Sequence, residues 1–405
     1  MEGMRCLLDK KMLSRRRWRR GGKAQRKRGR GIRWGRVYAV SRGFWRGEEK
    51  EGAVRRAWKG SMAEKKQHRL ELRTDLALEE KERFKGDGGE VKGVSLREWQ
   101  EADKDIQITE VKILNEQGAK AMGKEKGTYL TIEARGLEEK GEAFQEILAG
   151  KVAKQLQKLI NGLMEGGEKK DKRWKVLVVG LGNLYVTPDS LGPRVLQNLP
   201  MTRHYDEQYG KGFLKEHHMG SISGIAPGVM AQTGMETAEI LKGVVKETKP
   251  ELVIAIDALA ARSVRRLGCT IQLTDTGIRP GSGVGNHRNG LTQDSLGVPV
   301  LAVGVPTVVG AAAIVQDTIG AMVKVLEQGS STKGAGLYLE GLGPDEQYAL
   351  IRELLEPEFG PMFVTPPDIE ERVDLLGRVI SQAIRRALIG NEDSAKNGSG
   401  KAFSA

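Results

Sequence analysis

The sequence has very few cysteines: only Cys6 and Cys269 occur among its 405 residues. Two cysteines cannot build a disulfide framework, and this scarcity favours a protein of a reducing compartment. The N-terminus is basic, but no apolar stretch of the kind found in secretory signals follows it. These absences predict a cytoplasmic protein and argue against a secreted one.

Long hydrophobic runs are scarce as well. One uncharged stretch, residues 296–315, has the length of a membrane-spanning helix. Pro299 and Pro306 interrupt it, however, and residues 298–305 are typical of a buried parallel strand that leads into a helix. We therefore expect no contact with a membrane.

Motifs for common cofactors and nucleophiles are also missing. No histidine stands in a metal-binding spacing such as His-Glu-x-x-His, and no serine stands in a Gly-x-Ser-x-Gly motif. The glycine-rich stretch Gly281-Ser-Gly-Val-Gly-Asn286 fits neither the dinucleotide fingerprint nor the phosphate-binding P-loop. We expect no cofactor, with a divalent metal left as an open alternative.

The net charge of +13 is carried by the beginning of the chain. Residues 1–60 contain 21 Lys and Arg against 5 Asp and Glu, whereas the rest contains 45 against 48. Residues 1–61 form a basic, low-complexity tail that is either a nucleic-acid-binding arm or translated upstream sequence ahead of a start at Met62. We favour the second hypothesis, because Arg, Gly, Trp, Lys and Glu share purine-rich codons, and expect no direct contact with nucleic acid.

From residue 62 onward the hydrophobic pattern predicts strands that alternate with helices. Strands are predicted at residues 106–114, 128–134, 176–179, 252–256, 270–273 and 298–305. Helical spacing is found at residues 142–163, 235–246, 311–326, 345–355 and 369–388. This order predicts an α/β fold with a doubly wound, mostly parallel sheet, added N-terminal strands and C-terminal helices, followed by a frayed tail at 391–405.

Two aspartates follow predicted strands. Asp189 lies in the loop after residues 176–179 and a glycine turn, and Asp257 directly follows residues 252–256. Because sites form at the carboxyl ends of parallel strands, the two acids are candidates for a pair that activates water against a peptide carbonyl. Burial raises a carboxyl pKa, and a neighbouring acid splits the two titrations into acid and base. Each aspartate equally fits a helix N-cap, and the residues alone leave both interpretations open.

Several longer stretches carry a resemblance to a known family. They include Arg73-Thr-Asp-Leu-Ala-Leu-Glu79, Val179-Gly-Leu-Gly-Asn183 with Val186-Thr-Pro-Asp189, and Ile254-Ala-Ile-Asp-Ala-Leu-Ala-Ala-Arg-Ser263. Further stretches in the same order are residues 202–204, 226–230, 232–237, 275–278 and 280–286. Residues 72–388 resemble the spore germination protease family.

The resemblance implies a fold similar to that of the hydrogenase maturation proteases. It also implies an endopeptidase of unconventional aspartic type that assembles as a homotetramer. Such an enzyme initiates the degradation of small acid-soluble, DNA-protecting spore proteins in the spore core during germination. The family's two proposed catalytic aspartates fall on Asp189 and Asp257.

The resemblance further implies a zymogen that cuts itself between Asp75 and Leu76, a sequence similar to the one cut in spore proteins. Residues 62–75 would then be the propeptide and residues 76–390 a single protease domain. Residues expected to bind substrate or to shape the site are Gly182, Asn183, His204, Arg262, Asp275, Gly283, Gly285 and Asn286.

Two other functions compete with this interpretation. Residues 179–183, Tyr185 and residues 202–204 loosely resemble the beginning of the peptidyl-tRNA hydrolases, which are esterases of about half this length. A nucleic-acid-binding protein that acts through its basic tail is the third hypothesis, and its affinity would fall steeply with salt.

Overall fold

The computed structural model divides the chain into two units, residues 1–69 and residues 70–405, and the residues it describes all belong to the second unit. The described residues are 74–82, 91–101, 105–164, 174–210, 212–217, 219–284, 288–328, 347–348, 350–353, 355 and 362–389. The predicted basic tail, the propeptide before Thr74, Gly285, Asn286 and the predicted tail at 391–405 lie outside this part of the chain. Of the helix predicted at 345–355, residues 347–348, 350–353 and 355 are described, and they are helical.

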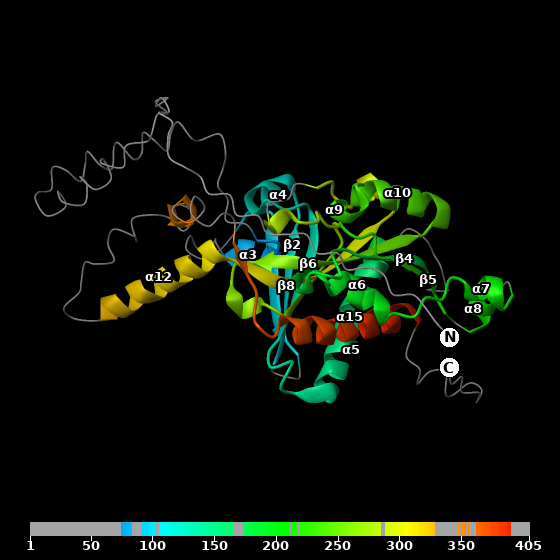
Figure 1. The fold of residues 1–405 in the computed structure, drawn as a ribbon, viewed down its shortest axis with the longest axis horizontal. Coiled ribbons are helices and arrows are strands. Elements are labelled where there is room, and N and C mark those ends of the chain that lie inside the picture. Colours follow the sequence, from blue (N-terminus) through cyan, green and yellow to red (C-terminus); the bar gives the residue numbers. More distant parts are fainter. Residues whose placement is uncertain are drawn as a thin grey trace, which may run out of the picture. The chain divides into compact units, whose positions relative to one another are not determined.

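A single sheet of nine strands organises the described residues (Figure 1). Its order is β1-β2-β3-β7-β8-β6-β4-β5, and β9 pairs with β8 outside this row. The strands are β1 (Val94–Gln100), β2 (Ile106–Ile113), β3 (Gly127–Ala134), β4 (Lys175–Gly180), β5 (Ser221–Ile225), β6 (Leu252–Ala261), β7 (Thr270–Thr274), β8 (Val300–Gly310) and β9 (Phe363–Val364).

The sheet is mixed, which corrects the prediction of a mostly parallel one. Among the described strands, parallel pairing is confined to β4 with β5, β4 with β6, and β6 with β8. β1, β2, β3 and β7 follow one another in antiparallel pairs, and β7 joins β8 in the same way. The connection between β1 and β2, residues 101–105, is too short for a crossover, so those strands form a hairpin.

Helices cover both faces of the parallel half. On one face, α5 (Gly141–Leu163), α6 (Leu191–Gln197) and α15 (Ile369–Ile389) bury their apolar sides against the sheet. On the other, α10 (Thr237–Thr248) and α11 (Gln293–Leu296) do the same, and Figure 1 shows α10 on the opposite side from α5. This double cover explains why these strands read as continuous apolar runs.

The remaining described helices are short or lie beside the sheet. They are α3 (Ala77–Glu82), α4 (Glu116–Met122), α7 (Tyr205–Gln208), α8 (Phe213–Glu216), α9 (Met230–Thr233) and α12 (Ala311–Gln328), with 3₁₀ turns at Thr187–Asp189, Val264–Arg266 and Ser282–Val284. No helix in the described part is both long and apolar enough to cross a bilayer. The uncharged stretch at 296–315 forms the end of α11, all of β8 and the start of α12.

β6 is longer than predicted. It continues through Asp257 to Ala261, so the aspartate lies inside the strand and not at its end. β4 pairs with β6 only up to Ile256, and the remaining residues of β6 keep an edge that β4 does not cover. This free edge positions the candidate site.

A bulge in β8 accompanies the extension of β6. Leu259 pairs with Pro306 and Ala260 with Val308, so Thr307 is an extra residue in β8. The bulge accommodates a proline in a central strand, because Pro306 has no N–H to give to a ladder and its carbonyl accepts the Gly268 N–H at 2.9 Å.

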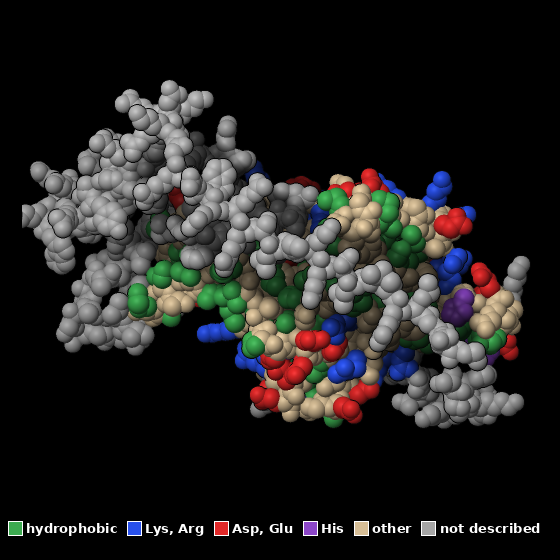
Figure 2. All heavy atoms as spheres, viewed as in Figure 1, with side chains coloured by type: hydrophobic (Ala, Val, Ile, Leu, Met, Phe, Trp, Pro, Cys, Tyr) green, Lys and Arg blue, Asp and Glu red, His purple; other side chains and the backbone are tan. Residues whose placement is uncertain are grey.

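The surface of the described unit is electrically mixed. Figure 2 shows Lys and Arg side chains interspersed with Asp and Glu on this face. The pattern agrees with the near balance of charge found beyond residue 60.

Candidate active site

Asp257 points to the face of β6 that also carries Val253 and Ala255, because side chains alternate along a strand. Its side chain is buried, and one carboxyl oxygen accepts the N–H of Ala258 at 3.0 Å. Burial, and then the charges of Asp189 and Asp75, raise the pKa of Asp257 well above its ordinary value. This environment favours the protonated form of the Asp257 carboxyl group.

Asp189 is held by the glycine turn that follows β4. The N–H of Asn183 donates to its carboxylate at 2.9 Å and to its main-chain carbonyl at 3.0 Å. Gly182 has a φ of +106°, and a Cβ there would lie 2.0 Å from the carbonyl oxygen of Asp189, so glycine is required for both reasons. Burial raises the pKa of Asp189, and the hydrogen bond from Asn183 opposes that rise.

The helix-cap interpretation is wrong for both aspartates. Ser190 occupies the N-cap position of α6, and the carboxylate of Asp189 turns back to Asn183. Asp257 lies within β6 and precedes no helix.

The two carboxyl groups lie close enough to influence each other, since the charge of Asp189 raises the pKa of Asp257. Arg288 lies near both, and its positive charge opposes the rise of both pKa values. Sequence reasoning missed this arginine, because nothing in its local sequence marks it. Its position shortly after the predicted glycine-rich loop was the only available signal.

The predicted cleavage site reaches the same place. The N–H of Asp75 donates to the Ala260 carbonyl at 3.0 Å, and the Ala260 N–H donates to the Asp75 carboxylate at 2.9 Å. Residue 75 therefore pairs with the free edge of β6. The hydroxyl of Ser282 binds the other carboxylate oxygen at 2.7 Å, and a Cβ at Gly283 would lie 2.2 Å from the carboxylate, so a side chain there would exclude Asp75.

At Leu76 and Ala77 the chain crosses the face of the sheet from β6 to β7. Leu76 is fully buried in a cluster with Leu259, Leu267 and Val309. The Ala77 N–H donates to the side-chain oxygen of Gln272 on β7 at 2.8 Å.

Glu79 anchors the next turn of this segment in a pocket of N–H donors. Its carboxylate accepts the N–H groups of Arg262 at 2.7 Å and Ser263 at 3.0 Å. The Arg266 guanidinium binds Glu79 at 3.1 Å and Glu82 at 2.8 Å. Burial lowers the pKa of Arg266, but its bond to Glu82 and the charges around it raise that pKa overall. Arg262, predicted to shape the site, contributes through its backbone.

Two other predicted residues have different surroundings. His204 precedes α7, and its ring packs against Tyr205 with centroids 4.6 Å apart, within an aromatic cluster of α7 and α8. Asp275 accepts the Thr128 N–H at 2.7 Å, which ties the end of β7 to the start of β3. The described contacts of these two residues are thus distinct from those of the aspartate pair.

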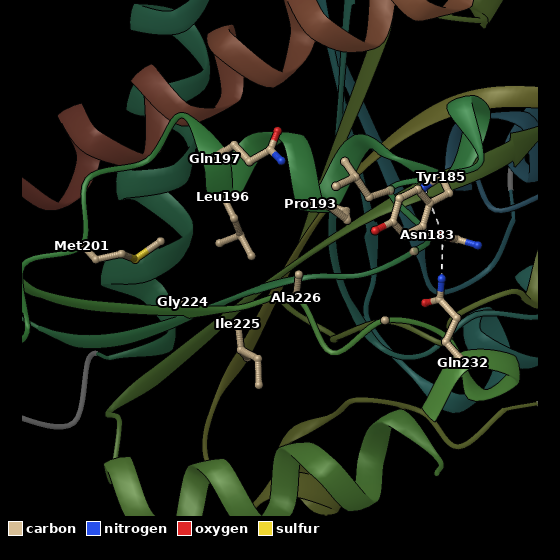
Figure 3. Close-up of a pocket in the computed structure, with 13 residues that line it drawn as sticks. Asn183, Tyr185, Pro193, Leu196, Gln197, Met201, Gly224, Ile225, Ala226 and Gln232 are labelled. Carbon is tan, nitrogen blue, oxygen red and sulfur yellow. Dashed lines mark hydrogen bonds between the residues drawn. The ribbon is translucent and has the colours of Figure 1, made fainter. Parts of the chain in front are cut away.

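A hollow of about 430 Å³ is lined in part by Gly182 and Asn183 of the glycine turn (Figure 3). Leu196, Met201 and Ile225 give it apolar walls. At its rim the Gln232 side chain donates to the Asn183 side chain at 3.1 Å. The turn that holds Asp189 is therefore also one wall of this hollow.

In the part of the chain that the structure describes, no three His, Cys, Asp or Glu side chains are arranged so that they could hold a metal ion. The donors found here instead surround a carboxylate pair and a length of peptide. This arrangement suits acid and base catalysis on an amide bond.

Comparison with known proteins identifies a family of peptidases. Residues 70–337 match the sequence profile of a family described as germination protease. The germination protease of Caldanaerobacter subterraneus subsp. tengcongensis is 50% identical over 79% of this chain and 94% of that protein. Those of Clostridium tetani and Priestia megaterium are 40% and 38% identical, over 79% and 78% of this chain and 96% and 93% of the relatives. The chain therefore belongs to the germination protease family, a family of peptidases.

Proposed function

We propose that this protein is the endopeptidase that initiates degradation of small acid-soluble spore proteins in the spore core during germination. The observation that carries the proposal is the position of Asp75, paired with the free edge of β6 and close enough to Asp257 to affect its pKa. Membership of the germination protease family supports the substrate class and replaces the peptidyl-tRNA hydrolase hypothesis.

The two aspartates take different roles because their surroundings differ. Asp257 is buried beside other acids that raise its pKa and favour its protonated form, which suits a general acid. Asp189 accepts an N–H from Asn183 and lies near Arg288, and both favour its ionised form, which suits a general base. Asp189 takes a proton from water as the water oxygen adds to the peptide carbonyl carbon. Asp257 then protonates the departing nitrogen as the C–N bond breaks.

The protein is made as a zymogen and cuts its own chain between Asp75 and Leu76. Its own segment lies where a substrate must lie, so the bond and the carboxyl groups need no encounter. The sequence from Thr74 to Glu79 resembles the cleaved sequence in the substrates, and a spore protein occupies the same contacts once the segment has left. We extend the proposal to the predicted homotetramer, which light scattering after gel filtration tests directly.

Incubation of the full chain, followed by N-terminal sequencing, tests the function. The wild type yields a product that begins at Leu76 and then cuts small acid-soluble spore proteins. Asp189→Asn and Asp257→Asn each slow both reactions at least about 100-fold. Asp294→Asn, a substitution of an exposed acid on α11, keeps the wild-type rates. Full cleavage by Asp257→Asn would remove this assignment.

A further inference from the structure

The carbonyl group of the Asp75–Leu76 bond is held by two donors from separate elements. The Lys124 ammonium donates to the Asp75 carbonyl oxygen at 3.0 Å, and the Gln272 side-chain amide donates to the same oxygen at 3.1 Å. This oxygen belongs to the bond that the proposed self-cleavage breaks. A negative charge that develops on this oxygen is therefore placed between the Lys124 ammonium group and the Gln272 N–H.

The end of α4 positions Lys124. Gly123 closes the helix in the left-handed conformation, with φ of +61°, and the Lys124 N–H bonds to the Ala119 carbonyl at 3.2 Å. Within the described residues, the Lys124 ammonium donates to the carbonyls of Thr74 and Asp75, and no carboxylate pairs with it. Its charge is therefore directed at peptide oxygens.

The sheet positions Gln272 opposite Asp257. Both residues pair with Gly304 of β8, Asp257 from one side and Gln272 from the other, so their side chains share one face of the sheet. Gly304 has no side chain between them, and the Leu259 side chain fills that space, since a Cβ at 304 would lie 2.3 Å from it. Asp257, Gly304 and Gln272 are therefore neighbours across three adjacent strands. The acid and the amide lie on two sides of the peptide of residues 75–77, which crosses this face of the sheet.

The orientation of the Gln272 amide is fixed by its other contact. Its oxygen accepts the Ala77 N–H at 2.8 Å, so its nitrogen is the atom that faces the Asp75 carbonyl. Gln272 is buried, and the two bonds to one peptide segment use both ends of its amide. A donor held this way needs no reorganisation when charge develops.

We propose that Lys124 and Gln272 are catalytic residues that bind the carbonyl oxygen of the bond being cut and stabilise the oxyanion formed when water adds to it. The inference rests on the proposed function. When water adds to the peptide bond, its oxygen bonds to the Asp75 carbonyl carbon and Asp189 takes its proton. The C=O electron pair moves to the carbonyl oxygen, which the two donors hold. When the C–N bond breaks, the electron pair returns to the carbonyl and Asp257 protonates the nitrogen. The carbonyl of a bound spore protein occupies the same position.

The test compares Lys124→Met with Lys126→Met in the full chain. Lys126 is a matched control, because its recorded ion pair is with the exposed Glu116 on the surface of α4. We expect Lys124→Met to lower the first-order rate of self-cleavage roughly 10²- to 10³-fold, the usual effect of removing one oxyanion donor, with Lys126→Met unchanged. Lys124→Gln, which keeps an N–H donor without the charge, is expected between the two.

A second measurement separates catalysis from simple docking of the segment. In the uncut Asp257→Asn background, hydrogen exchange of the Ala77 N–H reports whether residues 74–79 stay bound. We expect the same protection with and without Lys124→Met. Faster exchange that matches the loss of rate would overturn the catalytic role in favour of a structural one.

The outcomes also separate this inference from the function on which it rests. If Asp257→Asn abolishes cleavage while Lys124→Met and Lys124→Gln process at the wild-type rate, only the carbonyl-binding role is wrong. If Asp257→Asn itself cleaves normally, the proposed function fails. Gln272→Leu removes the buried donor. Its self-cleavage rate is compared with that of the wild type, and its melting temperature shows whether the variant is still folded.

Discussion

At the scale of single residues, environment alone distinguishes two chemically identical aspartates. Burial and the charges of two neighbouring acids raise the pKa of Asp257, whereas at Asp189 burial raises the pKa and the N–H of Asn183 opposes the rise. A glycine with positive φ folds the loop after β4 back onto Asp189, and the charge of Asp189 acts on Asp257. The catalytic assignment therefore depends on Gly182 as much as on the acids.

The raised pKa of Asp257 predicts a pH-dependent cost to folding. Because the folded state binds this proton more tightly than the unfolded state, stability falls as pH rises from the ordinary value of 3.8 through the raised one. Asp257→Asn removes that loss and should raise the free energy of unfolding at neutral pH. The gain should vanish in acid. Urea unfolding at acidic and neutral pH measures it, and an equal gain at both would contradict the shift.

At the scale of elements, sequence reasoning performed well for the regular pieces. Every strand and helix predicted between residues 106 and 326 is present within a few residues, because each has a clear apolar period. The extension of β6 was missed, since Ala258, Ala260 and Ala261 are weak strand formers that β8 holds in place.

The site was predictable only in part, for a related reason. Asp189 and Asp257 could be predicted because they follow apolar runs that indicate strands. Asp75 could be predicted because its stretch is part of the family resemblance. Lys124, Gln272 and Arg288 stand in no motif, and pairing between distant strands or loops brings them to the site. Positions set by tertiary pairing leave no local pattern to read.

The anchoring of α3 gives a prediction at this scale. Arg266→Met leaves the buried Glu79 and its neighbour Glu82 without their cation, and removing one partner of such a cluster costs about 3–5 kcal/mol. We expect residues 74–82 to detach and self-cleavage to slow at least about 10-fold. Limited proteolysis and the processing rate report both effects. Arg265→Met, at the exposed neighbour, is the control, and identical behaviour of the two variants would refute the anchoring role.

At the scale of the whole molecule, the predicted cleavage site separates a basic segment from a slightly acidic one. Residues 1–75 contain 25 Lys and Arg against 8 Asp and Glu, whereas residues 76–405 contain 41 against 45. The proposed self-cleavage at Asp75–Leu76 would thus convert a strongly basic chain into a slightly acidic one.

Ion exchange at neutral pH detects this change of sign. We expect the intact chain to bind a cation exchanger at low salt and the processed protein to pass through it, because binding follows net charge. Mass spectrometry of both fractions identifies the cut. A flow-through fraction that still carries residues 1–75 would show that the basic surplus does not govern this behaviour.

The pairing of Asp75 with β6 has one more consequence. Under the proposed self-cleavage, the same molecule presents the bond and cuts it, so we expect activation to follow first-order kinetics. The half-time of activation should then be independent of protein concentration, and neighbouring molecules should not change it. A dormant cell could therefore hold a large store of this enzyme without crowding alone setting it off.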